Sequence, residues 1–229
     1  MTETAQLTPV RMWLIRHGEP ETDAKGRCYG RLDWELSELG RFQAQMAAEA
    51  LSGEPLAAVY SSPRRRAWQS AEFLATAKGL EVQILEGLCE IDFGDFEGLT
   101  YEEIERQYPE QYQHWMTCPT EIHFPGGESF AQMQTRVIAA ITKLCQRHQG
   151  ESIAIVSHGG VNRIILAEAL GMRPTHIFRI AQRYAGLNLV TYYEGSPNVE
   201  LVNGRAKDAQ QALVTPCKEP ALDLSREFT

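Results

Sequence analysis

The sequence has no apolar run near the ~18–20 residues that a membrane-spanning helix needs. Residues 1–10 are polar and lack a basic region followed by an apolar stretch, so we expect no signal peptide and a cytoplasmic location. No C-x-x-C pair occurs among the 5 widely spaced cysteines, which argues against a zinc site or a disulfide framework and indicates free thiols. Internal repeats and low-complexity tracts are also missing.

Basic residues are in deficit, since 22 Lys and Arg against 30 Asp and Glu give a formal net charge of -8. We therefore expect no nucleic-acid partner, because such binding needs many cations at phosphates. A small anion can still bind where a local arginine cluster reverses the field. The hydrophobic share of 43% and the charged share of 23% are typical of globular proteins and exclude disordered, collagen-like and coiled-coil chains.

The length of 229 residues fits one domain, 1–229. We expect a core over about 11–204, a small covering insertion over about 91–127 and a loose C-terminal tail over about 205–229. Apolar strand segments alternate with helical patterns, which predicts an α/β protein, a three-layer α/β/α sandwich with a mainly parallel central sheet. The expected strands are 12–15, 57–60, 82–85, 153–156, 187–193 and 199–202.

The helical patterns predict which faces are buried. A helix over 38–51, capped by Ser37, is expected to have one apolar face, formed at helical spacing by Leu39, Phe42, Met46 and Ala50. Pro63 suits the first position of a second helix. A long helix over about 129–148 is expected to bury one stripe, formed by Phe130, Met133, Val137, Ile141 and Leu144.

Polar, chemically active residues follow several of the expected strands. Ligands of such sheets bind beyond the carboxyl ends of the strands. That edge receives Arg16 and His17, then Arg66, then Glu90 and finally His158. His158 and Arg66 also lie near helix N-termini, which favour anions. The set predicts an anion pocket that holds a nucleophile and an acid.

These groups suit the cleavage of a phosphomonoester. A neutral imidazole such as His17 can attack phosphorus and form a phosphohistidine. Arg16 and Arg66 supply planar cationic donors for phosphate oxygens, and His158 adds another donor. The carboxyl group of Glu90 can protonate the leaving oxygen and later act as a base. This chemistry requires no metal and no cofactor.

Four ordered segments resemble the histidine phosphatase superfamily, which includes the cofactor-dependent phosphoglycerate mutases. The segment Leu14–Glu19 is similar to the family signature, and Tyr60–Ala67 is similar to its second phosphate-binding segment. Leu88–Gly98 resembles the segment of the proton donor, and Ser157–Gly160 matches the second histidine. The resemblance runs from about residue 12 to about residue 170. It implies a phosphoglycerate mutase-like fold and a phosphoric monoester hydrolase.

Within the superfamily the sequence is most similar to small phosphatases of the α-ribazole phosphatase type, on segments 94–100 and 125–129. Mutases usually carry a basic, aromatic stretch after the glutamate, where Ile91–Gly94 stands here. The resemblance implies a small phosphorylated metabolite as partner, with α-ribazole 5′-phosphate as the best named substrate, and a monomer or homodimer. Asp23 departs from the family pattern, because many members carry Asn there, and an ionised Asp23 beside phosphate would be unfavourable.

Three alternatives remain open at this stage. The first is transfer of the phosphoryl group between phosphoglycerates, and the second is a non-catalytic phosphate-binding protein on the same fold. The third makes His17, His158 and acidic residues a metal site, which the neighbouring arginines disfavour.

Several nearby residues have plain structural interpretations. Arg64 and Arg65 are expected on a solvated helix face, and Asp92, Asp95 and Glu97 in loop capping. The histidines expected at the surface or the rim are His114, His123, His148 and His176. Five aromatic residues are expected either to line the mouth of the pocket or to pack in the core, namely Tyr29, Trp34, Tyr101, Trp115 and Phe124.

Overall fold

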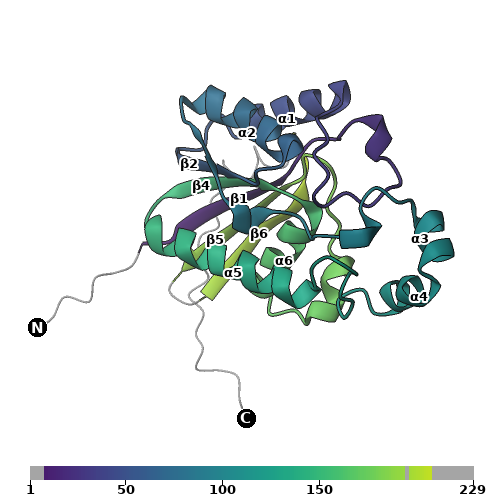
Figure 1. Cartoon of the computed structure of the whole chain (residues 1–229). Helices are drawn as coiled ribbons and strands as arrows, with labels where there is room; N and C mark the ends of the chain where they lie inside the picture. Colours follow the sequence, from purple (N-terminus) through teal and green to yellow (C-terminus); the bar gives the residue numbers. More distant parts are fainter. Residues whose placement is uncertain (1–7, 194–195, 208–229) are drawn as a thin grey trace, which may run out of the picture.

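A single six-stranded sheet runs through the computed structural model, which describes residues 8–193 and 196–207 (Figure 1). The strand order is β3-β2-β4-β1-β5-β6. The first four strands of the chain pair in parallel, and the last two add antiparallel at one edge. The bounds are β1 (Val10–Arg16), β2 (Leu56–Ser61), β3 (Val82–Ile84), β4 (Ser152–Ser157), β5 (Leu187–Tyr193) and β6 (Ser196–Gly204). The predicted α/β fold with a mainly parallel sheet is confirmed.

Helices cover both faces of the sheet. On one face lie α1 (Glu38–Ala50) and α2 (Arg65–Lys78), and on the other lie α5 (Phe130–Arg147) and α6 (Gly159–Ala169) (Figure 1). Each face has its own buried hydrophobic cluster. The three layers of the predicted sandwich therefore bury the sheet from both sides, as parallel sheets require.

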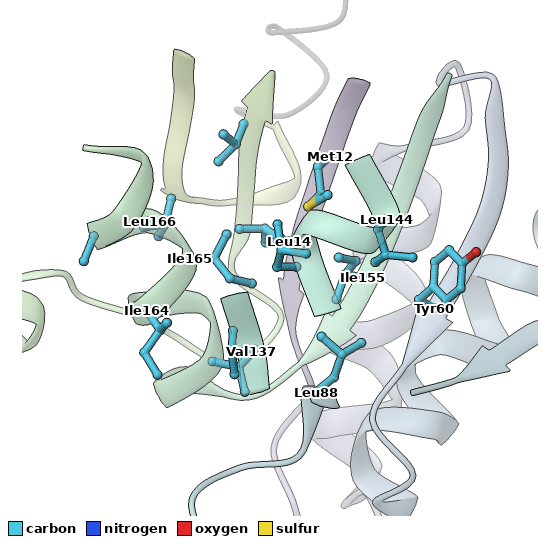
Figure 2. Close-up of a cluster of buried hydrophobic side chains, with 14 of the residues drawn as sticks. Met12, Leu14, Tyr60, Leu88, Val137, Leu144, Ile155, Ile164, Ile165 and Leu166 are labelled. Atoms are coloured by element: carbon cyan, nitrogen blue, oxygen red, sulfur yellow. The ribbon is translucent and has the colours of Figure 1, made fainter. Parts of the chain in front are cut away.

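The α5 face of the sheet carries the larger of these clusters. Figure 2 shows Leu14 and Ile155 of the strands beside Val137 and Leu144 of α5 and Ile165 of α6. The predicted stripe of α5 is confirmed, because all five of its residues are buried. A capping box between Ser129 and Gln132 fixes where the helix begins. The start of α5 is thus well defined, next to the segment that carries Glu90.

The predicted stripe of α1 is wrong at three of its four positions, and only Ala50 is buried. Leu39, Phe42 and Met46 are 51%, 59% and 37% exposed, whereas the buried face consists mainly of Gly40 and Ala44 and further alanines. Small residues allow the helix to approach its neighbours closely. Substitution of Gly40 by alanine would place a Cβ 2.0 Å from the carbonyl oxygen of Glu19, which is too close for any side chain. The predicted cap by Ser37 is present, and its hydroxyl accepts a hydrogen bond from Gly40.

The second helix begins two residues later than expected. Its N-cap is Arg64 and its first residue is Arg65, so Pro63 lies in the turn before the helix and not at its first position. Ser62 directly follows β2, and its N–H donates to the carbonyl of Val156 at the edge of the sheet at 3.1 Å.

The segment between β3 and α5 forms a small covering layer beyond the carboxyl ends of the parallel strands (Figure 1). It has a hydrophobic cluster of its own, which includes Phe96, Ile104, Trp115 and Phe124. Thr100 and Glu103 form the predicted capping box. The elements are η2 (Glu86–Leu88), η3 (Gly94–Phe96), α3 (Tyr101–Gln107) and α4 (Pro109–Thr117). Two further short helices are η1 (Thr22–Ala24) and η4 (Pro174–Arg179).

Three further sequence expectations concern membrane spans, the C-terminal tail and the cysteines. Within the described residues, none of the helices has the length and apolar character needed to cross a membrane. The expected C-terminal tail falls almost entirely on residues 208–229, outside the described residues. The four cysteines of the described ranges are free thiols, as the spacing predicted.

Candidate active site

One cavity of about 250 Å³ lies at the carboxyl edge of the sheet. His17 directly follows β1 and His158 directly follows β4, and these two strands are neighbours. The backbone N–H of His17 donates to the carbonyl of Ser157 at 2.9 Å, which continues the pairing into the loops. The predicted site residues all line this cavity, namely Arg16, His17, Arg66, Glu90 and His158.

His17 is held in one tautomer. Its Nδ1 lies 2.7 Å from the carbonyl oxygen of Gly18, and because a carbonyl can only accept, Nδ1 carries the proton. The lone pair therefore sits on Nε2. Burial of the ring, and then the charges of Arg66 and Arg16, lower the pKa of His17 well below its usual range. The imidazole is consequently neutral at physiological pH, which is the form that can act as a nucleophile.

His158 lies beside it, with the two ring centroids 5.2 Å apart. Its Nε2 is 2.8 Å from the hydroxyl of Ser62, which in turn accepts a hydrogen bond from the N–H of Arg64. Because His158 Nε2 is the one acceptor that the described residues offer to the Ser62 O–H, we assign this hydroxyl as donor to Nε2, which puts the ring proton on Nδ1. Burial, followed by the charge of Arg66, lowers the pKa of His158 well below its usual range. His158 is thus a neutral hydrogen-bond donor.

Arg66 is fully buried and is held by backbone carbonyls. Its Nη atoms donate to the carbonyls of Leu32, Tyr29 and Gly30 at 2.7–3.1 Å. Those three carbonyls come from the loop between β1 and α1. This loop therefore fixes the guanidinium without neutralising its charge.

Arg16 is fixed in a similar way. One Nη donates to the carbonyl of Gln182 at 2.6 Å, and its guanidinium lies 4.1 Å from the ring centre of Tyr184. The hydroxyl of Tyr184 meets that of Tyr29 at 2.8 Å, so the two tyrosines support both arginines. Cation–π contacts of this kind hold a guanidinium and leave its charge in place.

Three buried N–H donors of this site have no protein partner among the described residues. They are Nε of Arg16, Nε of Arg66 and Nδ1 of His158. A buried donor without a partner costs roughly 1–3 kcal/mol, so native proteins keep few of them. Three such donors on one cavity match the acceptor oxygens of a tetrahedral anion.

Glu90 reaches the cavity from an irregular segment between η2 and η3. Its carboxylate accepts hydrogen bonds at 3.0 Å from the N–H of Gly160, in the first turn of α6, and from its own neighbour Ile91. A Cβ at Gly160 would lie 2.3 Å from Oε1 of Glu90. Glycine at this position is therefore what lets the carboxylate approach the helix start.

Other predicted residues fall into clear groups. Asp23 is exposed and is not among the residues that line the cavity. Arg65 is exposed, as expected, and bonds to Glu35. Arg64 departs from the expected solvated position, because it is half-buried at the N-cap position of α2, where its side chain makes no capping hydrogen bond. Glu97 accepts hydrogen bonds from the backbone N–H groups of residues 30–32 and 93, and Asp92 accepts one from Gly94, in the loop-capping roles expected for them.

One expectation about the histidines is wrong. His148 is 5% exposed, and its ring bridges the hydroxyl of Tyr60 and the carboxylate of Glu151 at 2.8 and 2.6 Å. His114 and His123 are exposed, as expected.

Among the aromatic residues, Tyr29 and Tyr101 line the cavity, whereas Trp115 and Phe124 pack in the cluster of the covering layer. Sequence reasoning missed Arg163, which also lines the cavity from α6. Its position one helical turn after the glycines that follow His158 is the signal that points to it.

The geometry disfavours the alternative of a metal site. Within residues 8–193 and 196–207, no three His, Cys, Asp or Glu side chains are grouped so that they could hold a metal ion. His17 and His158 instead face the guanidinium groups of Arg16 and Arg66, which repel a cation.

Comparison with known proteins agrees with the site. The model of the histidine phosphatase superfamily, branch 1, matches residues 12–205. The chain belongs to this superfamily, and it is a histidine phosphatase that hydrolyses phosphomonoesters.

Three similar proteins carry different names within this superfamily. Phosphoserine phosphatase 1 of Hydrogenobacter thermophilus is 38% identical over 163 residues, which cover 71% of this chain and 77% of that protein. Phosphoglycerate mutase-like protein 4 of Arabidopsis thaliana is 39% identical over 159 residues, or 68% and 69% of the two chains. The solved structure of the α-ribazole phosphatase from Shigella flexneri has a TM-score of 0.77 and 28% identity, and covers 85% of this chain and 96% of that one.

Proposed function

We propose that this phosphatase hydrolyses small phosphomonoesters without a metal ion, through a phosphohistidine on His17. The observation that carries the proposal is the arrangement of one neutral imidazole and three buried, unpartnered donors around a single cavity. The donors belong to Arg16, Arg66 and His158. Together they match a phosphoryl group that His17 can approach.

In the first step, Nε2 of His17 attacks phosphorus. The P–N bond forms while the bond from phosphorus to the ester oxygen breaks, and protonated Glu90 gives its proton to the leaving oxygen. The two arginines and His158 donate to the non-bridging oxygens, where negative charge is concentrated in the transition state. The hydrogen bond from Nδ1 to Gly18 stabilises the phosphorylated ring.

In the second step, a water molecule attacks the phosphorus. Ionised Glu90 takes a proton from that water, the new P–O bond forms and the P–N bond breaks. Phosphate leaves, His17 returns to its neutral form and Glu90 is protonated again. Each residue thus ends the cycle as it began.

For the substrate we propose a small phosphorylated metabolite, with two candidates. Phe93 and Tyr101 line the cavity, and these aromatic rings support α-ribazole 5′-phosphate, whose leaving group carries an aromatic base. The relatives named as phosphoserine phosphatases support phosphoserine. The segment after Glu90 lacks the basic residues expected of a mutase, which favours release of phosphate over transfer.

The test compares His17→Ala with the exposed-histidine control His123→Ala on an aryl phosphate, with and without a chelator. We expect kcat/KM to fall at least about 10³-fold for His17→Ala, no change for the control and no effect of the chelator. Full activity of His17→Ala would refute the mechanism. Phosphate binding without turnover of any substrate by the unaltered protein would favour the non-catalytic alternative. A screen of phosphoserine, α-ribazole 5′-phosphate and 3-phosphoglycerate, with free phosphate as readout, then ranks the substrates.

A further inference from the structure

Arg136 lies outside the cavity but is bound to the segment that carries Glu90. It belongs to the second turn of α5, and its side chain is 26% exposed. Its Nη1 donates to the carbonyls of Gly87 and Cys89 at 3.0 and 2.7 Å, and Nη2 donates to the carbonyl of Glu90 at 3.1 Å. Three donors of a single guanidinium thus hold the main chain at the acid and just before it.

The remaining donors of Arg136 go to Glu128. Nε and Nη2 meet the two carboxylate oxygens at 2.7 and 2.8 Å in a bidentate pair. All five N–H groups of the guanidinium are therefore engaged. The side chain of Glu128 is 15% exposed, so the pair is largely withdrawn from solvent. A paired, charge-assisted contact of this kind is more rigid than an ion pair at the surface.

Glu128 binds the main chain just after Glu90. Its carboxylate accepts from the N–H of Asp92 at 3.4 Å, and its own N–H donates to the carbonyl of Asp92 at 2.9 Å. The stretch from residue 89 to residue 93 belongs to neither a strand nor a helix, so no regular ladder holds it. Arg136 and Glu128 hold this stretch by hydrogen bonds to its main chain, which a strand or helix would receive from neighbouring backbone groups.

We propose that the Arg136–Glu128 pair is the positioning device of Glu90, required for proton donation to the leaving group and not for phosphate binding. The inference rests on the proposed role of Glu90. Among the described residues, the carboxylate accepts hydrogen bonds only from the N–H groups of Ile91 and Gly160, so its place depends on the main chain behind it. Proton transfer needs hydrogen-bond geometry, and small displacements of a reacting group are costly.

The experiment varies how much the leaving group needs a proton. An alkyl phosphate such as glycerol 3-phosphate leaves as a strongly basic alkoxide, whereas 2,4-dinitrophenyl phosphate leaves as a stable phenolate. The variants are Arg136→Met, Glu128→Gln and Glu90→Gln, with Arg147→Met as the matched control, since Arg147 is an exposed arginine of the same helix. The quantity compared is kcat/KM, which reports the phosphorylation of His17.

We expect Arg136→Met to lower kcat/KM about 30–100-fold on the alkyl phosphate and less than about 3-fold on the dinitrophenyl ester, since general acid catalysis contributes about 10²–10⁴-fold. Glu128→Gln shows a smaller shift in the same direction, and Arg147→Met shows none. In the Glu90→Gln background, Arg136→Met adds less than about 3-fold, because residues that act as a unit are not additive.

Two results would overturn the inference. One is an equal loss on both esters, which would mean that Arg136 only maintains the fold or the phosphate pocket. The other is a full additional loss in the Glu90→Gln background. If Arg136→Met does not fold, as judged by circular dichroism, Glu128→Gln decides by the same ratio. The proposed role of Glu90 as proton donor is tested separately. It fails if Glu90→Gln lowers kcat/KM equally on both esters.

Discussion

Acidification should destabilise the folded protein through two buried histidines. The pKa values of His17 and His158 are lowered well below their usual range by burial and by the nearby arginines, chiefly Arg66. In the unfolded chain each imidazole titrates at about pH 6.5. As the pH falls through that value, the unfolded chain takes up two protons that the folded protein does not. The unfolded state then binds more protons, so the free energy of unfolding falls as the pH falls.

The size of this effect follows from proton counting. A histidine that stays neutral in the folded protein costs about 1.4 kcal/mol between about pH 7.5 and about pH 5.5, so the two together cost about 2.7 kcal/mol. His158→Gln removes one of them and keeps a polar group next to Ser62. The decrease in the free energy of unfolding over this range should therefore be about 1.4 kcal/mol smaller in the variant.

Urea unfolding at the two pH values measures these quantities directly. The buffers must be free of phosphate, because a bound anion would favour the protonated rings. The exposed-histidine variant His123→Gln serves as control and should keep the decrease of the unaltered protein. An identical decrease in His158→Gln and in the unaltered protein would show that His158 is protonated in the fold, and would refute the account of its burial.

Two substitutions test the phosphate pocket and its glycine. Arg66→Met should weaken competitive inhibition by inorganic phosphate about 10–100-fold, since it removes a charged donor, while Arg65→Met at the exposed neighbouring position should change it less than about 2-fold. Equal effects of the two would contradict the assignment. Gly160→Ala should displace the carboxylate of Glu90 and lower kcat on an alkyl phosphate about 10-fold or more, with little change in thermal stability. Unchanged kcat would show that Glu90 does not need this close approach.

Much of the site could be predicted from the sequence because its residues follow strands. His17 and His158 come directly after apolar strand segments, and parallel strands bring their carboxyl ends to one edge. The sequence therefore indicated which side chains meet. It could not indicate that Tyr184 lies under Arg16, because that contact joins residues 168 positions apart in an irregular loop.

Sequence patterns did not indicate features that depend on contacts between distant parts of the chain. Hydrophobic periodicity favours large side chains as the buried face, but close packing of α1 selects Gly40 and alanines and leaves Phe42 at the surface. Likewise, a lone histidine such as His148 carries no pattern that tells its buried hydrogen bonds from a surface position. Arg136 is similar, since its importance lies in carbonyl partners that are 46–49 residues away.

The most direct test of the proposed mechanism is to trap the phosphorylated enzyme. The protein is mixed with a ³²P-labelled phosphomonoester, quenched in alkali within its first turnover, and digested for peptide analysis. We predict label that is stable in alkali and labile in acid, attached to the peptide that contains His17 and absent from His17→Ala. Release of labelled phosphate at full rate with no label on that peptide, or label on His158 instead, would contradict the account.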